Sequence, residues 1–451
     1  MKVLLLTLGS HGDVHPFVGL ALALRARGHA PVIATNGHFE SLIRGVGIDF
    51  LPIGSEEEYH RLTADKDLWS PSRAFKVVFQ AVAETLRKSY DLVARFVETH
   101  GEDALVVHSS LGLAARIARD KFDFPLATVH LQPGVIRSLV DPPKLPGLFM
   151  PRWMPMWLKR GIWEGGDKYV VDPVIAPRLN ALRKELGLPP VRRILKDWWH
   201  SPDLVVGLFP EWYAPPPVDW PRQFQATGFP LWDEQGVTPM PLELDRFLEA
   251  GEPPVAFTPG SAMQHGHAFF AAAAEACRRA GLRGLLLTRK SDQIPASLPE
   301  GVIHVPYAPF TDLLPRCAAV VHHGGIGTAA QGLRAGIPQL IMPMAHDQPD
   351  NAHRLQKLGL ALALSPRKFT ARNVARALTA LLGDANYGSR AREYARSFLG
   401  VDALTDTVRL LETLRATHRP SPVDPTAARS LAAGAAPGAR SPGSKPAPVP
   451  S

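Results

Sequence analysis

Glycine, histidine and threonine residues gather in the second half of the chain, in a spacing that could bind a diphosphate. An apolar run at 319–321 leads into this group, which consists of His322, His323, Gly324, Gly325, Gly327 and Thr328. Glycines let a backbone approach a ligand closely, and the unpaired N–H groups at the start of a helix favour negative charge. The spacing predicts a strand, a glycine turn and a helix N-terminus that binds phosphate, with the side chains of His323 and Thr328 as further donors.

This turn does not identify a ligand by itself. Its spacing is neither GxxxxGK[ST] nor GxGxxG, so neither a P-loop nor a dinucleotide fingerprint is indicated. A tight turn in an ordinary α/β domain would explain the same residues. The pair Asp347-Gln348 favours a functional site, because it follows the apolar strand predicted at 340–342. At the carboxyl end of a neighbouring strand, the pair would meet a polar ligand in the same crevice.

A second stretch whose side chains could do chemistry, GSHGDVHP, follows the first apolar run of the chain. It supplies three groups that could accept a proton, namely His11, Asp13 and His15. An unperturbed Asp has a pKa near 3.9 and an unperturbed His a pKa near 6.5. Asp13 would therefore act as a base only with late, concerted proton transfer or with a pKa raised by burial. The alternative for Asp13 is a helix N-cap, where Asp is common.

Length and composition indicate a globular protein of two domains. The chain has 451 residues, of which 45% are hydrophobic and 20% are charged. Its two cysteines, Cys277 and Cys317, offer neither a disulfide framework nor a metal-ligand spacing, which fits a reducing cytoplasm. No apolar run approaches the roughly 18 residues of a membrane span. No nucleic-acid motif is present, so neither DNA nor RNA is expected as a partner.

Cations and tryptophans coincide in residues 137–200. This segment holds 12 Lys and Arg against 6 Asp and Glu, and 5 of the 9 tryptophans. The coincidence predicts a surface that meets anionic lipid headgroups or an amphipathic acceptor. The alternative is a solvated face above buried tryptophans, since positive patches are common in a protein with a net charge of +8.

Strands and helices alternate along both halves of the chain. The buried strand at 2–7 is followed by a helix that ends at Gly28, and strands and helices continue to alternate to about residue 207. A proline-rich stretch at 210–221 interrupts this alternation, and a new strand at 255–257 restarts it. The fold class is therefore α/β, with two Rossmann-like halves that each open with a strand and a glycine turn.

The residues around the glycine turn resemble a signature of a known family. His323 to Thr328, followed by Pro338, Pro343, Asp347-Gln348 and Asn351, resembles the donor-binding signature of the UDP-glycosyltransferase superfamily. The bacterial branch is the most similar: enzymes that resemble sterol 3-beta-glucosyltransferases, macrolide and vancomycin-type glycosyltransferases, and the rhamnosyltransferase of rhamnolipid synthesis. The resemblance implies the GT-B fold, in which two Rossmann-like domains face each other across a cleft and a C-terminal helix crosses back.

The same resemblance implies a domain organisation. The expected parts are an acceptor-binding domain at 1–215 with a Trp- and Pro-rich acceptor insert at 133–200, a linker at 216–240, a nucleotide-sugar-binding domain at 241–387, a returning helix at 388–418 and a tail at 419–451. The tail holds prolines with Ala, Gly and Ser and almost no large apolar side chains, so its composition predicts disorder.

Roles for individual residues follow from the resemblance. Asp13 occupies the position of the catalytic base, with His11 and His15 as rival bases or sugar contacts. The expected donor-binding residues are Gly12, Ser261, Tyr307, Ala308, His323, Gly325, Gly327, Thr328, Asp347 and Gln348. Tyr307 would stack on the nucleobase, and the backbone of Ala308 would pair with its edge. For Tyr307 the alternative is a plain core aromatic.

One position departs from the plant members of the superfamily. They place a Glu on the ribose hydroxyls where this chain has Gln331, which still donates and accepts hydrogen bonds. Either UDP-glucose or a dTDP-sugar such as dTDP-rhamnose fits this change. No Asp-x-Asp motif appears, so we expect a metal-independent enzyme without a cofactor.

The sequence therefore predicts an inverting glycosyltransferase. It would move a hexose from a nucleotide-diphosphate sugar to a hydroxyl of a hydrophobic small molecule or lipid, in the cytoplasm or peripherally on the inner face of the membrane. The alternatives are a nucleotide-sugar epimerase or hydrolase on the same fold, and a non-catalytic nucleotide-sugar or lipid-binding module.

Overall fold

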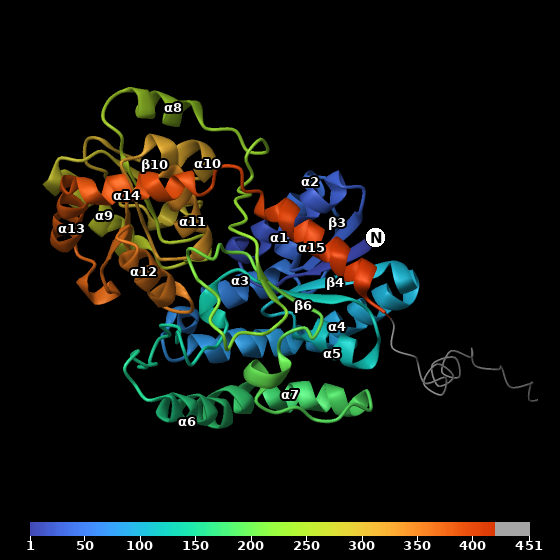
Figure 1. Cartoon of the computed structure of the whole chain (residues 1–451). Helices are drawn as coiled ribbons and strands as arrows, with labels where there is room; N and C mark the ends of the chain where they lie inside the picture. Colours follow the sequence, from blue (N-terminus) through green and yellow to red (C-terminus); the bar gives the residue numbers. More distant parts are fainter. Residues whose placement is uncertain (420–451) are drawn as a thin grey trace, which may run out of the picture. The chain divides into compact units, whose positions relative to one another are not determined.

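Two parallel β-sheets form the frame of the protein in the computed structural model, which describes residues 1–419 (Figure 1). The first sheet has the strand order β3-β2-β1-β4-β5-β6-β7. Its strands are β1 (Lys2–Leu6), β2 (Ala30–Thr35), β3 (Asp49–Pro52), β4 (Ala104–Ser109), β5 (Leu126–His130), β6 (Leu204–Gly207) and β7 (Phe224–Ala226). The second sheet has the order β10-β9-β8-β11-β12-β13. Its strands are β8 (Val255–Thr258), β9 (Gly284–Leu287), β10 (Val302–Val305), β11 (Ala319–His322), β12 (Gln339–Ile341) and β13 (Ala361–Ala363).

Both sheets reverse their strand order at one point. The reversal lies between β1 and β4 in the first sheet and between β8 and β11 in the second. In doubly wound sheets, ligands bind beyond the carboxyl ends of the strands at this point. The GSHGDVHP stretch follows β1, and the glycine turn follows β11. The predicted pair of Rossmann-like halves is confirmed, and both candidate stretches stand at the switch points.

Helices cover both faces of each sheet. The helices of the first lobe are α1 (His11–Ala26), α2 (Glu40–Gly45), α3 (Glu56–Ala64), α4 (Ala74–His100), α5 (Leu113–Lys121), α6 (Met156–Gly166) and α7 (Asp172–Glu185). Those of the second are α8 (Leu242–Glu249), α9 (His267–Ala280), α10 (Phe310–Leu313), α11 (Ile326–Ala335), α12 (Gln348–Lys357), α13 (Ala371–Gly383) and α14 (Ala385–Arg396). The last described helix is α15 (Ala403–Thr417).

Successive residues of the central strand β1 belong to two different hydrophobic cores of the first lobe. Leu4 and Leu6 belong to the core that includes α4 and α5, whereas Val3 and Leu5 belong to the core that includes α1 and α15. Successive strand residues point to opposite faces of a sheet, so a strand covered on both faces must be apolar throughout. This is why β1 reads as a continuous apolar run.

The segment expected as one returning helix at 388–418 is divided into two. α14 packs on the second lobe through Ala391, and only α15 lies against α1, where Glu412 forms ion pairs with Arg27 and His29 at 2.8 Å. The break has a local cause: Gly400 has a φ of +74°, and the Asp402 carboxylate accepts hydrogen bonds from Thr405 at the start of α15. Asp at this position is a helix-start signal.

The stretch expected as a linker at 216–240 is partly strand. β7 pairs with β6, so the first sheet extends to Ala226. Apolar residues of both lobes then share one core cluster, which includes Phe209 and Tyr213 from the first lobe and Leu333 and Leu355 from the second. Residues 1–417 accordingly form one compact unit.

Two further expectations concern the membrane and the tail. Among the described residues, no helix combines the length and the apolarity needed to span a bilayer. The disordered tail expected at 419–451 lies, from residue 420 onward, outside the described residues.

Candidate active site

Asp13 lies in the first turn of α1, directly beyond the carboxyl end of β1. Ser10, rather than Asp13, is the N-cap of this helix. The Asp13 Oδ2 atom accepts hydrogen bonds from the backbone N–H of Ser10 at 2.8 Å and from its hydroxyl at 3.2 Å. These bonds fix the carboxylate at the helix N-terminus. Gly9, with a φ of +136°, makes room for it, because a Cβ atom there would lie 2.2 Å from Oδ2.

The loop after β12 brings a second carboxylate toward Asp13. Burial, and to a smaller extent the negative charge of Asp347, raise the pKa of Asp13 to about 6, against the hydrogen bonds from Ser10 and the influence of His346. Burial likewise raises the pKa of Asp347 to about 6. Two carboxylates from opposite lobes therefore lie in one electrostatic environment. Such a raised pKa suits a base that works near neutral pH.

Asn351 connects this loop to the glycine turn. Its amide nitrogen donates to the Gly324 carbonyl at 2.9 Å and to the Asp347 carboxylate at 2.6 Å, and its oxygen accepts from the Tyr213 hydroxyl at 3.2 Å. Asn351 is fully buried. No separate role was predicted for it from the sequence. The signal was its spacing of four residues from Asp347, which places both on one face of a helix.

The ring of His323 lies between two glycine backbones. Cβ atoms added to Gly260 or Gly325 would come within 2.6 Å of the ring. Burial, together with the neighbouring His322 and His346, lowers the pKa of His323 to about 3. The imidazole is therefore neutral, and its Nδ1 atom has no hydrogen-bond partner among the described residues. A neutral ring can donate one hydrogen bond to a ligand oxygen.

Gln348 is the other member of the predicted sugar-binding pair, and its side chain is buried. Its Oε1 atom accepts hydrogen bonds from the backbone N–H groups of Met344 at 2.8 Å and Ala345 at 3.1 Å. Gln348 therefore shapes the loop that carries Asp347. Only its amide NH₂ group remains for a ligand.

Tyr307 lies on a platform built by the linker and by the segment after β9. Its hydroxyl donates to the Asp233 carbonyl at 2.6 Å, and the guanidinium of Arg289 lies 4.3 Å above its ring. The adjacent Ala308 is buried. Gln331 is also buried, and its amide donates to the Leu231 carbonyl at 3.0 Å. Gln331 thus holds the linker in place in addition to any contact with a ligand.

His11 and His15 face the linker and Arg289. His15 Nε2 lies 3.2 Å from a Glu234 oxygen, and His11 Nε2 lies 3.2 Å from Arg289. Burial, together with His15 and Arg289, lowers the pKa of His11 to about 3. Burial would raise the pKa of Glu234, but His15 and Arg289 beside it lower the pKa to about 2. Each of the two histidines thus has a polar partner, as Asp13 has in Ser10.

The remaining predicted donor residues follow three strands: Gly12 follows β1, Ser261 follows β8, and Gly327 and Thr328 follow β11. Gly12 and Ser261 are exposed, as is Gly327, whereas Thr328 is half-buried at the start of α11. Ile326, which begins α11, packs against the core that contains α1. The glycine turn and the Asp13 turn therefore belong to adjoining parts of the two lobes.

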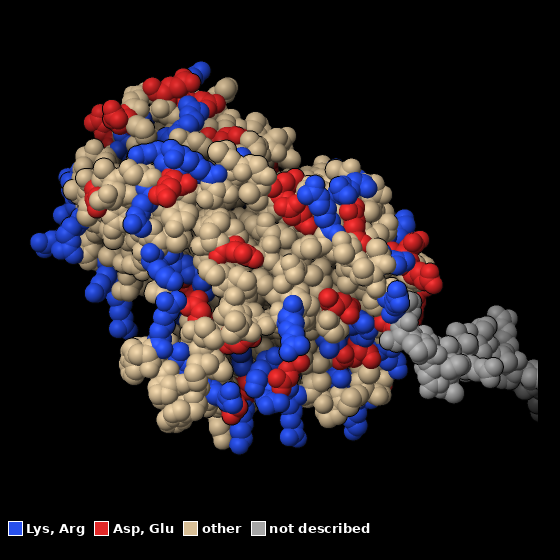
Figure 2. All heavy atoms as spheres, in the orientation of Figure 1, with Lys and Arg blue, Asp and Glu red and all other residues tan. Residues whose placement is uncertain are grey.

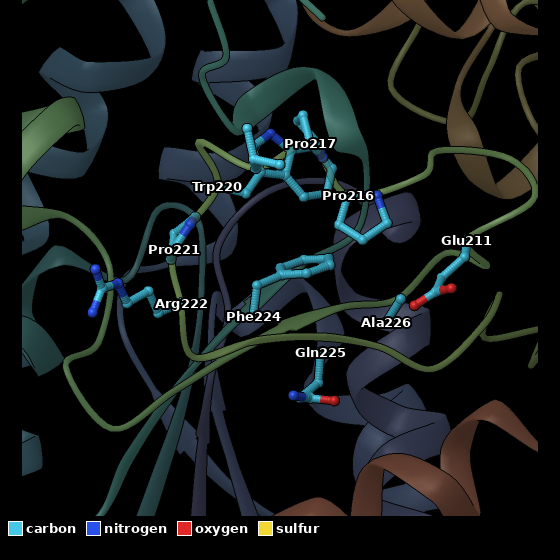
Figure 3. A pocket seen from close by; sticks show the side chains of 10 residues that line it. Glu211, Pro216, Pro217, Trp220, Pro221, Arg222, Phe224, Gln225 and Ala226 are labelled. Atoms are coloured by element: carbon cyan, nitrogen blue, oxygen red, sulfur yellow. The ribbon is translucent and has the colours of Figure 1, made fainter. Parts of the chain in front are cut away.

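A separate pocket lies along β7, at the edge of the first sheet. Figure 3 shows the Phe224 ring among the proline and tryptophan side chains that line this pocket. Glu211 and Arg222 lie at the two ends of the pocket. The pocket is lined by Glu211, Pro216, Pro217, Val218, Trp220, Pro221, Arg222, Phe224, Gln225 and Ala226. None of the predicted site residues lines it, so it does not locate the chemistry.

Gly260→Ala tests the packing around His323. Its φ of +98° and the 2.6 Å approach to the ring predict a loss of about 2–5 kcal/mol in the free energy of unfolding, measured by urea denaturation. The matched control is Gly281→Ala, because Gly281 has a φ of +64° with open space around it, and should lose only about 1–2 kcal/mol. Equal losses in the two variants would contradict the close packing of His323.

Comparison with known proteins gives the chain a family. Residues 3–118 match the glycosyltransferase family 28 N-terminal domain, and residues 285–414 match the erythromycin biosynthesis protein CIII-like C-terminal domain. The chain is 31% identical over 394 residues to O-mycaminosyltylonolide 6-deoxyallosyltransferase of Streptomyces fradiae, which covers 84% of this chain and 90% of that protein. It is 28% identical over 403 residues to the sterol 3-beta-glucosyltransferase of Yarrowia lipolytica, covering 84% of this chain and 26% of that protein.

Solved structures of glycosyltransferases have the same fold. The spinosyn forosaminyltransferase SpnP has a TM-score of 0.68 at 23% identity, over 92% of this chain and 99% of its own. The spinosyn rhamnosyltransferase SpnG complexed with thymidine diphosphate has a TM-score of 0.67 at 17% identity, over 91% of this chain and 100% of its own. The resemblance seen in the signature residues is thereby confirmed. The chain belongs to the family that joins a glycosyltransferase family 28 N-terminal domain to an EryCIII-like C-terminal domain, and it is a glycosyltransferase with the GT-B fold.

Proposed function

We propose that the protein is an inverting, metal-independent hexosyltransferase. The first lobe binds a hydrophobic acceptor alcohol, and the second lobe binds a nucleotide-diphosphate sugar. The observation that carries this proposal is geometric: Asp13 follows β1 and the glycine turn follows β11, each at the switch point of its sheet, and Asn351 ties Asp347 to that turn. The negative charge of Asp347 also contributes to the raised pKa of Asp13. An acceptor alcohol beside Asp13 would thus lie next to a sugar held by Asp347.

The proposed reaction is a single displacement. The acceptor oxygen attacks the anomeric carbon of the sugar, and the bond from that carbon to the diphosphate oxygen breaks. The alcohol proton passes to the Asp13 carboxylate, and the electron pair of the broken bond leaves on the nucleotide diphosphate. Backbone N–H groups at the start of α11, the neutral His323 and the hydroxyl of Thr328 would stabilise the diphosphate. Attack from the face opposite the leaving group inverts the anomeric configuration.

The donor and acceptor classes are also part of the proposal. The donor is UDP-glucose or a dTDP-sugar, and solved neighbours complexed with thymidine diphosphate support the second choice. The acceptor is a macrolide-like or sterol-like alcohol, as the names of the relatives suggest. A thermal-shift panel of nucleotide sugars, followed by transfer assays with both acceptor types, tests this function. A rise in melting temperature with one donor and formation of a glycoside support it. Sugar isomerisation or hydrolysis without any transfer would overturn it.

We expect transfer to continue after metal removal. The diphosphate is met by backbone N–H groups and neutral side chains at the glycine turn, so no cation is required to offset its charge. The measurement compares initial transfer rates before and after dialysis against EDTA, with and without added Mn²⁺. Loss of activity that Mn²⁺ restores would contradict the metal-independent mechanism.

We propose further that a surface formed by residues 140–170 meets an anionic membrane. Its large exposed apolar side chains are Val140, Phe149, Trp153, Met156, Trp157, Leu158, Tyr169 and Val170. Trp153 is 79% exposed and Trp157 74%. Figure 2 shows uncharged side chains over the region of α6 with Lys and Arg beside them. Exposed aromatics flanked by cations are typical of interfacial anchors, and a membrane contact would bring the first lobe to lipid acceptors.

Vesicle binding tests this surface. The double variant Trp153→Ser with Trp157→Ser should reduce co-sedimentation with phosphatidylglycerol vesicles by about tenfold or more, since each substitution removes an aromatic anchor. The control is Leu399→Ser, because Leu399 is an equally exposed apolar residue outside this surface. Equal binding by both variants, or no binding by the unmodified chain, would contradict the proposal.

A further inference from the structure

Two histidines and a glutamate gather on the first lobe, outside the residues assigned to transfer. His38 lies in η1 (Gly37–Phe39), which follows β2, and Glu56 and His60 lie one turn apart on α3, which follows β3. Glu56 Oε1 is 3.2 Å from His38 Nδ1 and 3.4 Å from His60 Nε2. One ligand atom from each residue lies within 4.8 Å of the other two.

These separations match the needs of a small divalent cation. Zinc binds histidine nitrogen and carboxylate oxygen at about 2.0–2.2 Å in tetrahedral geometry, so neighbouring ligand atoms lie about 3.3 Å apart. Two imidazoles and one carboxylate form a ligand set typical of catalytic zinc sites, which leave the fourth position to water. The exposure of Glu56 and His60 gives an ion access from solvent.

Local contacts hold the two ligand-bearing segments together. The side-chain oxygen of Asn36 accepts from the His38 backbone N–H at 2.9 Å, and its amide donates to the Ser55 carbonyl at 2.9 Å. Ser55 caps α3 through hydrogen bonds with Glu58. The His38 ring stacks on Tyr59, with ring centroids 4.3 Å apart and planes 8° apart. Ligand side chains held in place in this way distinguish a metal-binding site from an isolated surface ion pair.

We propose that the chain binds one zinc-class divalent cation through His38, Glu56 and His60. The ion takes no part in transfer; it clamps α3 to the segment after β2. α3 also contacts the second lobe, because the hydroxyl of Thr63 accepts a hydrogen bond from Gln264 at 3.1 Å. The Leu68 carbonyl in η2 (Lys66–Trp69) lies 2.9 Å from His346 Nε2, beside Asp347. Binding of the ion therefore stabilises the part of the first lobe that contacts the loop with His346 and Asp347.

The test is a zinc titration of the untagged full-length chain after chelation, followed by calorimetry and by the melting temperature. We expect one Zn²⁺ per chain and a rise of about a few degrees in melting temperature. Bound Co²⁺ should give the visible absorption of a tetrahedral site. His60→Ala and Glu56→Gln should each weaken Zn²⁺ binding by about tenfold or more.

The control is Glu57→Gln, which removes the same charge from the neighbouring exposed position of α3. Unchanged Zn²⁺ affinity in this control, with loss in the two ligand variants, supports the site. Absence of Zn²⁺ binding, or equal affinity in all variants, would overturn it. These readouts do not depend on transfer, so they stand apart from the test of the enzymatic function.

Discussion

Replacing Asp13 by Asn is expected to lower kcat/KM for transfer by about 10²–10⁴-fold, the range for loss of a general base. The amide has the shape of the carboxylate and can still accept the two hydrogen bonds from Ser10, so α1 should keep its start. It cannot accept the alcohol proton. Affinity for the nucleotide diphosphate, measured by calorimetry, should stay within about twofold, because the proposed site for that ligand is in the second lobe.

The same variant should be more stable than the unmodified protein at pH 7. The folded pKa of Asp13, about 6, lies above that of an unfolded Asp. The unfolded chain therefore loses its proton first, and folding stability falls as pH rises from about 4 to about 6. Asn removes this cost of burying a charge, which is on the order of 2 kcal/mol. Urea denaturation at pH 7 and pH 4 should show the gain at pH 7 only. Full transfer activity in Asp13→Asn would instead move the base role to His11 or His15.

The second expected result is an acid limb in the pH profile. The proposed mechanism uses the Asp13 carboxylate as base, so we expect kcat/KM to fall about tenfold per pH unit below a midpoint near 6. Because the charge of Asp347 contributes to the raised pKa of Asp13, Asp347→Asn should move this midpoint to lower pH. The readout is the position of the midpoint, which remains measurable when the rate itself is reduced.

Asp406→Asn, a charge change on α15 at a residue whose carboxylate pairs with Arg409 on the same helix, is the control and should leave the midpoint in place. A midpoint that stays near pH 6 in Asp347→Asn would contradict the electrostatic link between the lobes. A midpoint that moves in both variants would show that net charge, rather than proximity, controls the titration.

The fold could be predicted because its signals are local. Short apolar runs mark most of the strands, and the strands of the two sheets have three to six residues each. The failures were also local. β7 has three residues just beyond the proline-rich stretch at 210–221, too few for a pattern. The break between α14 and α15 depends on the positive φ of Gly400 and on the helix cap that Asp402 forms.

The candidate site was only partly predictable. Asp13 and the glycine turn were found because each follows a strand and the family signature covers them. The neighbours of the two histidines beside Asp13 come from distant segments: Glu234 and Arg289 meet His15 and His11 across more than 200 residues. Such contacts depend on the packing of the two lobes, for which one sequence carries no local pattern. The hydrogen bond from the Gln331 amide to the Leu231 carbonyl is another such contact, and the ligand contact predicted for Gln331 stays a prediction.

The configuration of the product tests the central claim most directly, because a single displacement with Asp13 as base allows only one outcome. Transfer from a donor of known anomeric configuration to an acceptor alcohol can be followed by the proton coupling at the anomeric carbon of the product. We predict a glycoside of the configuration opposite to that of the donor. A product that retains the donor configuration would contradict direct attack by the alcohol and, with it, the role of Asp13.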